Sequence, residues 1–180
     1  MKILITGVAG FIGFSLAKSL LNNNISVTGI DNLNKYYSKK LKLKRISILK
    51  KNKLFKFYKV DINKRKKVDK FLKKKFTHIF HFAAQPGVRE TKNFPEKYFY
   101  SNEVGFFNIL NNFKENNKIK IFYASSSSVY GDQKKYPSKE NYSLMPKNIY
   151  GITKKHNEEL AEHFNKIYGL KIIGLRFFTV

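Results

Sequence analysis

Three side chains in the carboxyl-terminal part of the chain could move a proton and a hydride together. Tyr150 and Lys154 stand four residues apart, so on a helix both leave the same face and reach one bound substrate. A free tyrosine ionises near pH ~10, and it becomes a useful base near neutral pH only when a cation stabilises its phenolate. Lys154 would be that cation, while Ser126 would hydrogen-bond the substrate oxygen that gives its proton to Tyr150. The pattern therefore indicates redox chemistry on an alcohol.

The context of this tyrosine and lysine matters more than their spacing. Tyr-x-x-x-Lys also begins at Tyr36 and at Tyr130, in a lysine-rich chain where chance matches are expected. Only the pair that begins at Tyr150 lies in a run with one apolar face, 149–168, which the periodicity predicts to be a helix. A run of serines, 125–128, precedes this helix-like run. The alternative is that the tyrosine packs against a sheet and the lysine is solvated.

The amino terminus has the pattern of a strand, a glycine turn and a helix. An apolar run at 2–6 leads into Gly7, Gly10 and Gly13, and a helix-like run follows at 14–21. Glycines there let the backbone turn tightly and approach a pyrophosphate, whose charge is met by the amides and dipole of the helix start. The spacing differs from the commoner Gly-x-Gly-x-x-Gly fingerprint. For the glycines alone, a simple tight turn is therefore the alternative.

A second predicted strand, 26–30, ends in Asp31. An acidic residue at that point accepts the two hydroxyls of an adenosine ribose and repels a 2′-phosphate, which favours NAD over NADP. Three lysines follow closely, Lys35, Lys39 and Lys40, and would soften this preference. Together with the glycine turn, Asp31 predicts a dinucleotide site.

These motifs resemble those of the extended short-chain dehydrogenase/reductase family, and within it the NAD-dependent nucleotide-sugar epimerases and dehydratases. The resemblance runs from Met1 to Val180, and its segments are 6–13, 31–37, 61–62, 81–89, 124–131, 150–154 and 174–180. It implies a tightly held NAD. The residues that it places at this cofactor are Gly7, Gly10, Phe11, Ile12, Gly13, Asp31, Asn32, Asp61, Ile62, Phe82, Ala83, Ala84, Asn102, Tyr150, Lys154 and Phe178. In the same pattern Ser126, Tyr150 and Lys154 are catalytic.

The residues after the active-site hydroxyl bear on the reaction. Similar dehydratases carry an acidic pair there to protonate a leaving oxygen, whereas this chain has Ser127 and Ser128. Epimerisation at C4 of a nucleotide sugar is therefore the better fit. Tyr150 would remove the proton of the C4 hydroxyl, and the C4 hydride would pass to NAD and return to the other face of a transient 4-keto sugar. A 4,6-dehydratase and a keto-sugar reductase are the alternatives on the same scaffold.

Three segments, 31–37, 83–89 and 177–180, most resemble those of UDP-glucuronate 4-epimerases, which form UDP-galacturonate. The resemblance implies a UDP-sugar site that includes Arg89, Ser127, Ser128 and Thr179; for Arg89, a surface arginine after a turn is an equal alternative. Members of this family are longer and pair as homodimers. We therefore expect a C-terminally truncated chain that lacks most of the UDP site and could be inactive alone.

The remaining pattern predicts the fold. Apolar runs suited to buried strands recur at 3–6, 27–30, 54–60, 79–82, 119–124 and 172–175, with helical spacing between them. This alternation predicts an α/β fold, a Rossmann-type doubly wound parallel sheet with helices on both faces. We expect an NAD-binding Rossmann domain at 1–174 and, at 175–180, the start of a substrate-binding portion that is otherwise missing. The aperiodic stretch 133–148 predicts a substrate-side loop.

Charge is the one feature that points elsewhere. The chain has 36 Lys and Arg residues against 12 Asp and Glu, a formal net charge of +24, and such a balance is common in nucleic-acid binders. The lysines concentrate at 35–53 and 64–75, where they alternate with apolar residues as the solvated faces of amphipathic helices would. The bias is also typical of AT-rich codon drift. A dinucleotide- or nucleic-acid-binding module without catalysis is thus the alternative from another class, and we do not expect nucleic acid as a partner.

Several further classes are disfavoured by composition. Cysteine is absent, so disulfides and thiolate chemistry are excluded and the cytoplasm is the expected compartment. No apolar stretch approaches the roughly 18 residues of a membrane span, so we expect no membrane partner. The four histidines show no ligand spacing with carboxylates, which predicts no metal site.

Overall fold

Six parallel strands form one sheet in the order β3-β2-β1-β4-β5-β6, in a computed structural model that describes residues 1–73, 76–88, 91, 93–133 and 136–179. The strands are β1 (Ile3–Thr6), β2 (Val27–Asp31), β3 (Phe55–Lys59), β4 (His78–His81), β5 (Lys120–Ser126) and β6 (Lys171–Phe177). The order reverses between β1 and β4, as in doubly wound dinucleotide folds, whose ligands bind at that point outside the carboxyl ends of the strands. The predicted fold class is confirmed.

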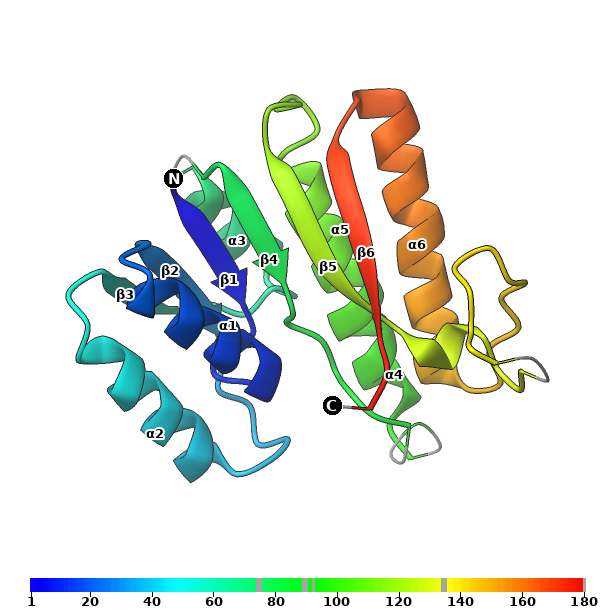
Figure 1. Ribbon diagram of the computed structural model, residues 1–180, viewed down its shortest axis with the longest axis horizontal. Coiled ribbons are helices and arrows are strands. Elements are labelled where there is room, and N and C mark those ends of the chain that lie inside the picture. The colour runs from blue at the N-terminus through cyan, green and yellow to red at the C-terminus, as the bar shows by residue number, and fades with distance from the viewer. Residues whose placement is uncertain (74–75, 89–90, 92, 134–135, 180) are drawn as a thin grey trace.

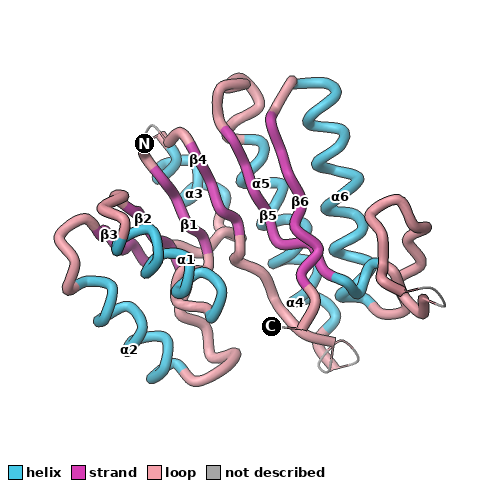
Figure 2. The backbone as a smooth tube through the Cα atoms, in the orientation of Figure 1, coloured by secondary structure: helices cyan, strands magenta, loops and turns pink. Residues whose placement is uncertain are grey.

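Helices lie on both faces of the sheet (Figures 1 and 2). They are α1 (Phe11–Asn22), α2 (Lys39–Lys50), α3 (Arg65–Leu72), α4 (Pro95–Tyr98), the π-helix η1 (Phe99–Val104), α5 (Gly105–Asn111), the 3-10 turn η2 (Ser127–Val129) and α6 (Ile149–Tyr168). In Figure 1, α1 and α2 lie in front of the β1–β3 half, whereas α3 and α5 lie behind the sheet and α6 lies beside β6. Because all six strands are parallel, each crossover brings the chain back to the same end of the sheet, and the loops after the strands all lie at the opposite end.

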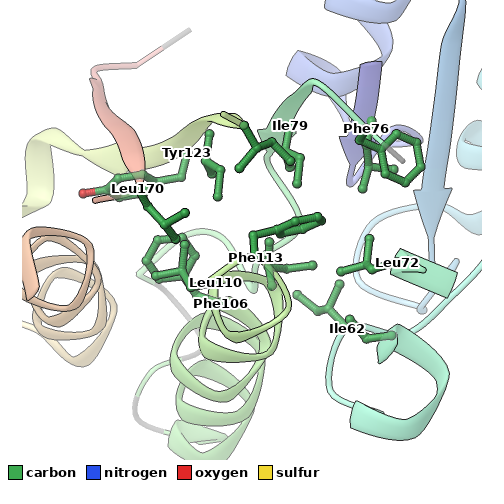
Figure 3. Close-up of a cluster of buried hydrophobic side chains, with 14 of the residues drawn as sticks. Ile62, Leu72, Phe76, Ile79, Phe106, Leu110, Phe113, Tyr123 and Leu170 are labelled. Carbon is green, nitrogen blue, oxygen red and sulfur yellow. The ribbon is translucent and has the colours of Figure 1, made fainter. Parts of the chain in front are cut away.

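Two apolar clusters hold these layers together. The larger cluster joins the sheet to α3, α5 and α6, and Figure 3 shows its aromatic centre, where Phe106 and Phe113 lie among Ile79, Leu110 and Tyr123. The second cluster joins the other face of β1, β2 and β3 to α1 and α2. Parallel sheets are typically covered on both faces, and these two clusters supply that cover for β1, β2 and β3.

The half of the sheet made by β4, β5 and β6 is covered on one face only. On the side where α1 and α2 lie, no helix of the described residues covers these strands (Figure 1). Phe80 and Phe122 stack there with ring centroids 5.0 Å apart, and Ile173 is 50% exposed. An apolar patch of Phe80, Phe122 and Ile173 thus faces outward on this half-sheet.

The sequence pattern predicted the strands to within about two residues and the helix at 149–168 at both ends. Residue 174, the predicted domain boundary, lies inside β6, whose residues pair with β5 as far as Phe177; the boundary itself stays a prediction. The expectation that the lysines of α2 are all solvated is wrong for Lys42, which is buried, while Leu41 and Leu43 are exposed. The Lys42 ammonium is accommodated because it donates to the carbonyl and side-chain oxygens of Asn34.

Candidate active site

One cleft of about 880 Å³ lies outside the carboxyl ends of the strands. The loops that follow β1, β2, β4 and β5 all contribute to its walls, together with the end of β6 and the first two turns of α6. The predicted residues that line it are Gly7, Gly10, Phe11, Ile12, Gly13, Asp31, Asn32, Ile62, Phe82, Ala83, Ala84, Ser126, Ser127, Ser128, Tyr150, Lys154, Phe178 and Thr179. Segments far apart in the sequence therefore meet at a single site.

The glycine turn forms the floor of this cleft. Gly7 has a φ of +69°, and a Cβ added to it would lie 2.7 Å from the backbone nitrogen of Ala83. A Cβ on Gly13 would lie 2.4 Å from the Gly7 carbonyl oxygen. The turn can be this tight only without side chains. Helix α1 begins directly after it with Gly10 at the N-cap, and the first amides of such a helix have no partner within the helix. They are available to an anion in the cleft.

Asp31 is fixed at the end of β2 before any ligand arrives. Its two carboxylate oxygens accept hydrogen bonds from the backbone nitrogens of Ala9, at 3.1 Å, and Leu33, at 2.8 Å. The side chain joins the glycine turn to the loop after β2, and it is 8% exposed. A carboxylate with four lone-pair sites retains acceptor capacity after two such bonds. Asp31 can thus still accept from the hydroxyls of a ribose.

Helix α6 presents Tyr150 and Lys154 to the cleft, and its start is set by local chemistry. The Asn148 side chain caps the helix by accepting from the Gly151 nitrogen at 2.8 Å. A Cβ on Gly151 would lie 2.6 Å from the carbonyl oxygen of Ser128. The glycine therefore lets the first turn of α6 touch the serine segment, which brings Tyr150 close enough to hydrogen-bond Ser126.

Burial is the main influence on the pKa values of Tyr150 and Lys154. Desolvation raises the pKa of Tyr150 above its ordinary value; the hydrogen bond with Ser126 lowers it, and Tyr98 and Tyr37 raise it. Lys154 is 3% exposed, donates to the Ala124 carbonyl at 2.8 Å, and has a pKa lowered by burial to about 8. The sequence predicts that the lysine lowers the pKa of the tyrosine. The structure differs because the ammonium lies 5.8 Å from the centre of the phenol ring and donates to a carbonyl instead.

A third member of this helix face anchors the arrangement. Glu158 lies four residues beyond Lys154 and pairs with Arg176 of β6 through two contacts, of 2.9 and 2.7 Å. It also accepts from the Ser125 hydroxyl at 2.5 Å. The hydrogen bond with Glu158 raises the pKa of Arg176, so the guanidinium is always charged. The pair thus joins α6, β5 and β6 directly beside the catalytic strand end.

Two predicted cofactor residues do not line the cleft. Asn102 is 1% exposed in η1, and its amide bonds the backbone of Gln85 in both directions, at 2.8 and 3.2 Å, and donates to Thr153 at 3.0 Å. Thr153 in turn donates to the carbonyl of Tyr150 at 2.8 Å. Asn102 therefore holds Gln85 and Thr153 together next to the cleft without lining it. The Asp61 carboxylate instead accepts from the nitrogen of Asn63 at 3.0 Å.

One predicted site residue is not described by the structure, and several residues of the cleft were not predicted. Arg89, predicted to hold the substrate, lies outside the described residues. The cleft is also lined by residues that were not predicted as site residues, among them Tyr36, Tyr37, Lys42, Arg45 and Ser125. Both tyrosines lie in the segment that follows Asp31, which is the signal that could have found them. Lys42 and Arg45 had no such signal, because α2 is rich in basic residues.

The described residues contain no group of three or more His, Cys, Asp or Glu side chains placed to hold a metal ion. Within the same part of the chain, no helix combines the length and the apolar character needed to cross a membrane.

Comparison with known proteins agrees with this geometry. Residues 3–180 match the model of the NAD dependent epimerase/dehydratase family. A UDP-glucuronate 4-epimerase of Arabidopsis thaliana is 42% identical over 100% of this chain and 42% of its own length, and an uncharacterized protein of Methanocaldococcus jannaschii is 45% identical over 99% of this chain and 56% of its own. The chain thus spans about half the length of the curated relatives it matches.

Solved structures are similar over the same span. The UDP-glucuronic acid 4-epimerase of Bacillus cereus in complex with UDP-glucuronic acid and NAD matches 99% of this chain and 57% of its own, with 34% identity and a TM-score of 0.93. The UDP-glucose 4-epimerase of Thermus thermophilus in complex with NAD has 29% identity and a TM-score of 0.84 over 98% of this chain and 54% of its own.

Proposed function

The chain belongs to the NAD dependent epimerase/dehydratase family, and on that premise we propose that it takes part in NAD-dependent epimerisation at C4 of a UDP-sugar. The observation that carries the proposal is the convergence of Ser126, Tyr150 and Lys154 with the glycine turn in one cleft. That convergence puts a hydroxyl, a phenol and a buried ammonium beside a pyrophosphate cradle, as a reversible oxidation of an alcohol requires.

The described residues fit NAD. The cradle at Gly7 and Gly13 has no room for a Cβ, the first amides of α1 face the cleft, and Asp31 retains acceptor capacity for two ribose hydroxyls. A carboxylate there repels a 2′-phosphate, so NAD is preferred to NADP. When bound, the nicotinamide would supply reversible hydride acceptance; Phe178 lines the cleft and is the residue that we propose to lie near it.

The chain's own residues would handle the proton. Ser126 hydrogen-bonds Tyr150 and can orient the hydroxyl of a sugar between them. Tyr150 accepts the C4 hydroxyl proton on oxidation and returns it on reduction. Lys154 adds a buried positive charge to the same cleft, where it donates to the Ala124 carbonyl, and desolvation remains the main cause that raises the pKa of the phenol. Ser127 and Ser128 line the cleft where a dehydratase would need an acid, so water elimination has no proton donor at these positions.

UDP-glucuronate is the substrate that we propose, with UDP-galacturonate as product. The Arabidopsis and Bacillus relatives named for this sugar support it. Ser127, Ser128 and Thr179 lie in the cleft and offer hydroxyls to the sugar, and Arg89 remains our proposal for its carboxylate. A dehydrated 4-keto product, or net consumption of reduced cofactor, would instead identify a dehydratase or a keto-sugar reductase.

We extend the proposal to the oligomeric state, the domain boundary and the cellular compartment of the protein. The outer faces of η1, α5 and α6 expose apolar side chains, among them Phe99, Tyr100, Phe107 and Ile152, which are 39 to 55% exposed. Such a surface suits pairing with a second copy, so we propose a homodimer through these helices. Residues 1–174 form the NAD-binding domain in this proposal, and residues 175–180 begin the substrate-binding portion. The expected compartment is the cytoplasm.

Cofactor identity is tested first. Purified protein is denatured and the released nucleotide is identified by mass spectrometry. Stoichiometric NAD supports the proposal, NADP would favour a reductase, and a protein that neither carries nor takes up NAD would contradict it.

The reaction is tested by supplying UDP-glucuronate and resolving the sugars by chromatography. We expect UDP-galacturonate, with Tyr150→Phe slowing its formation by at least about 100-fold because the base is removed. Tyr136→Phe is the matched control, since Tyr136 is 78% exposed and does not line the cleft. Equal rates in the two variants would contradict the role of Tyr150.

A further inference from the structure

Four side chains bind one another near the carboxyl ends of β5 and β6, and they are here called the clamp: Ser125, Tyr130, Glu158 and Arg176. The Arg176 guanidinium donates to both carboxylate oxygens of Glu158, from Nε at 2.9 Å and from Nη2 at 2.7 Å. The Ser125 hydroxyl donates to the same carboxylate at 2.5 Å, and Nη1 of the guanidinium donates to the Tyr130 hydroxyl at 2.9 Å. The clamp therefore connects β5, β6, α6 and the residue that follows η2.

The clamp lies next to the residues that each of these elements supplies to the cleft. Ser125 directly precedes Ser126 and is the register partner of Arg176 in the sheet. Arg176 directly precedes the end of β6, which lines the cleft. Glu158 follows Lys154 by four residues, about one turn along α6. A shift of any one clamp residue would therefore move a side chain or a backbone segment of the site.

Arg176 also holds the loop that leads from η2 to α6. Its Nη1 donates to the carbonyl of Glu140, in the middle of this loop, at 2.9 Å. The two ends of the loop meet, because a Cβ added to Gly131 would lie 2.0 Å from the carbonyl oxygen of Met145. The chain thus enters α6 from a loop that is closed at its base and bonded to the same guanidinium as the helix.

Stability alone is a poor explanation for the ion pair of the clamp. The side chains of Arg176 and Glu158 are only 19% and 16% exposed, so both charges have lost most of their hydration. An apolar pair of similar size often holds a fold as well as a buried ion pair does. An apolar pair does not fix direction, whereas two parallel hydrogen bonds between a guanidinium and a carboxylate fix both distance and angle. The clamp is therefore suited to set geometry.

We propose that Arg176 is a positioning residue for the epimerisation: its planar fork holds the end of β5 against α6, so that Ser126 stays within hydrogen-bond distance of Tyr150. The inference rests on the proposed function. Ser126 and Tyr150 act on one sugar hydroxyl, first as it loses its proton and then as it regains it. A displacement of about 1 Å can slow such a step about 100-fold. Arg176 itself does not line the cleft, and it acts through Glu158 and Ser125.

Arg176→Lys tests the fork, because it keeps the positive charge and loses the paired donors. We expect kcat for UDP-glucuronate to fall at least about tenfold, with KM changed less than about twofold, because the variant misplaces the reacting groups without removing a contact to the sugar. Arg65→Lys is the matched control, since Arg65 also pairs with a carboxylate, that of Asp69, but both side chains are exposed. Both constants should be unchanged in it. An unchanged kcat in Arg176→Lys, or a raised KM alone, overturns the proposal.

A double variant separates positioning from damage to the fold. Glu158→Met combined with Arg176→Met replaces the ion pair by an apolar pair and leaves no lone charge. We therefore expect its stability to heat to stay close to that of the unmodified chain, while kcat falls as in Arg176→Lys. A stable double variant that keeps the unmodified kcat overturns the proposal.

An NMR signal of Tyr150 gives a test that needs no turnover. Tyrosine is labelled with ¹³C at Cζ, the carbon that bears the hydroxyl, and the signal of Tyr150 is identified by its absence in Tyr150→Phe. Ser126→Ala gives the chemical shift of the phenol without its serine partner. We expect Arg176→Lys to move the Tyr150 signal toward that value, and Arg65→Lys to leave it in place.

The NMR result also separates this inference from the proposed function. An unmoved Tyr150 signal in Arg176→Lys overturns the positioning role and leaves the proposed function intact. A moved signal in a chain that does not epimerise UDP-glucuronate supports the positioning role and contradicts the proposed function alone.

Discussion

At the scale of one residue, Lys154 places a charged group in the site at a cost to the stability of the folded chain. Its ammonium is buried, and burial lowers its pKa to about 8 from 10.5. A depressed pKa means that the folded state binds fewer protons than the unfolded state between these two values, so stability rises with pH across that interval. The difference corresponds to about 3 kcal/mol. Below about pH 8 the whole penalty weighs against the folded state.

Lys154→Met removes this penalty. At pH 7 we expect the variant to be more stable than the unmodified chain, by up to about 3 kcal/mol less the lost hydrogen bond to Ala124. The advantage should shrink as pH rises from about 8 to 10.5. Chemical unfolding of both proteins at several pH values gives the difference between their free energies of unfolding. The other lysines contribute equally to both proteins, so their titration cancels in this difference. A constant difference across that range would contradict a buried, destabilised ammonium.

Which residues meet was predictable from the sequence, but their contacts were not. The predicted helix at 149–168 and the serine run before it sufficed to predict that Ser126, Tyr150 and Lys154 share one site, because strand ends and helix faces repeat regularly. The acceptor that Lys154 uses is the carbonyl of Ala124, and a backbone atom leaves no mark in the side-chain pattern. Asn102 has the residue type that suits a ligand, yet its amide is occupied by Gln85 and Thr153.

At the scale of elements, the approach of α6 to the serine segment is decided by Gly151. A Cβ there would lie 2.6 Å from the Ser128 carbonyl oxygen, and neither backbone can yield without moving Tyr150 away from Ser126. Such contacts between backbones are absent from any pattern of apolar spacing. For this reason the sequence predicted where α6 begins and ends, but it did not predict how closely α6 approaches the serine segment.

Gly151→Ala tests this contact. An alanine gains up to about 1 kcal/mol of helix propensity, but overpacking costs about 1–3 kcal/mol, so we expect a net loss of stability in thermal unfolding together with weaker catalysis. Gly169→Ala is the comparison: its φ is +66°, but an added Cβ would meet nothing closer than 4.0 Å. It should lose stability through backbone strain alone and leave the site unchanged. A Gly151→Ala protein as stable and active as the unmodified chain would show that the contact is loose.

At the scale of the whole molecule, the apolar patch of Phe80, Phe122 and Ile173 is the feature that hydropathy did not predict. Short apolar runs that alternate with segments of helical spacing predicted the doubly wound topology. The same pattern assumes cover on both faces of every strand. Which half of the sheet stays open depends on where helices return, and this is a property of the assembled layers.

The open patch should make the chain self-associate in excess of a dimer. Ile173→Lys places a charge in its middle, and Ile173 is already 50% exposed, so the fold should tolerate it. We expect sedimentation velocity to show larger species for the unmodified chain and fewer for the variant. Lys171, which is exposed on the same strand, gives the control Lys171→Gln. Identical distributions in all three proteins would exclude the patch as the cause.

The cradle under the cleft also has a genetic consequence. Gly7 and Gly13 each leave no room for a Cβ, and every change in the first or second base of a glycine codon introduces a residue that has one, or a stop. Only the third base can vary without cost to the turn. A mutational bias that favours lysine codons can therefore alter the surface helices freely, but at these two codons it can change only the third base without disrupting the turn.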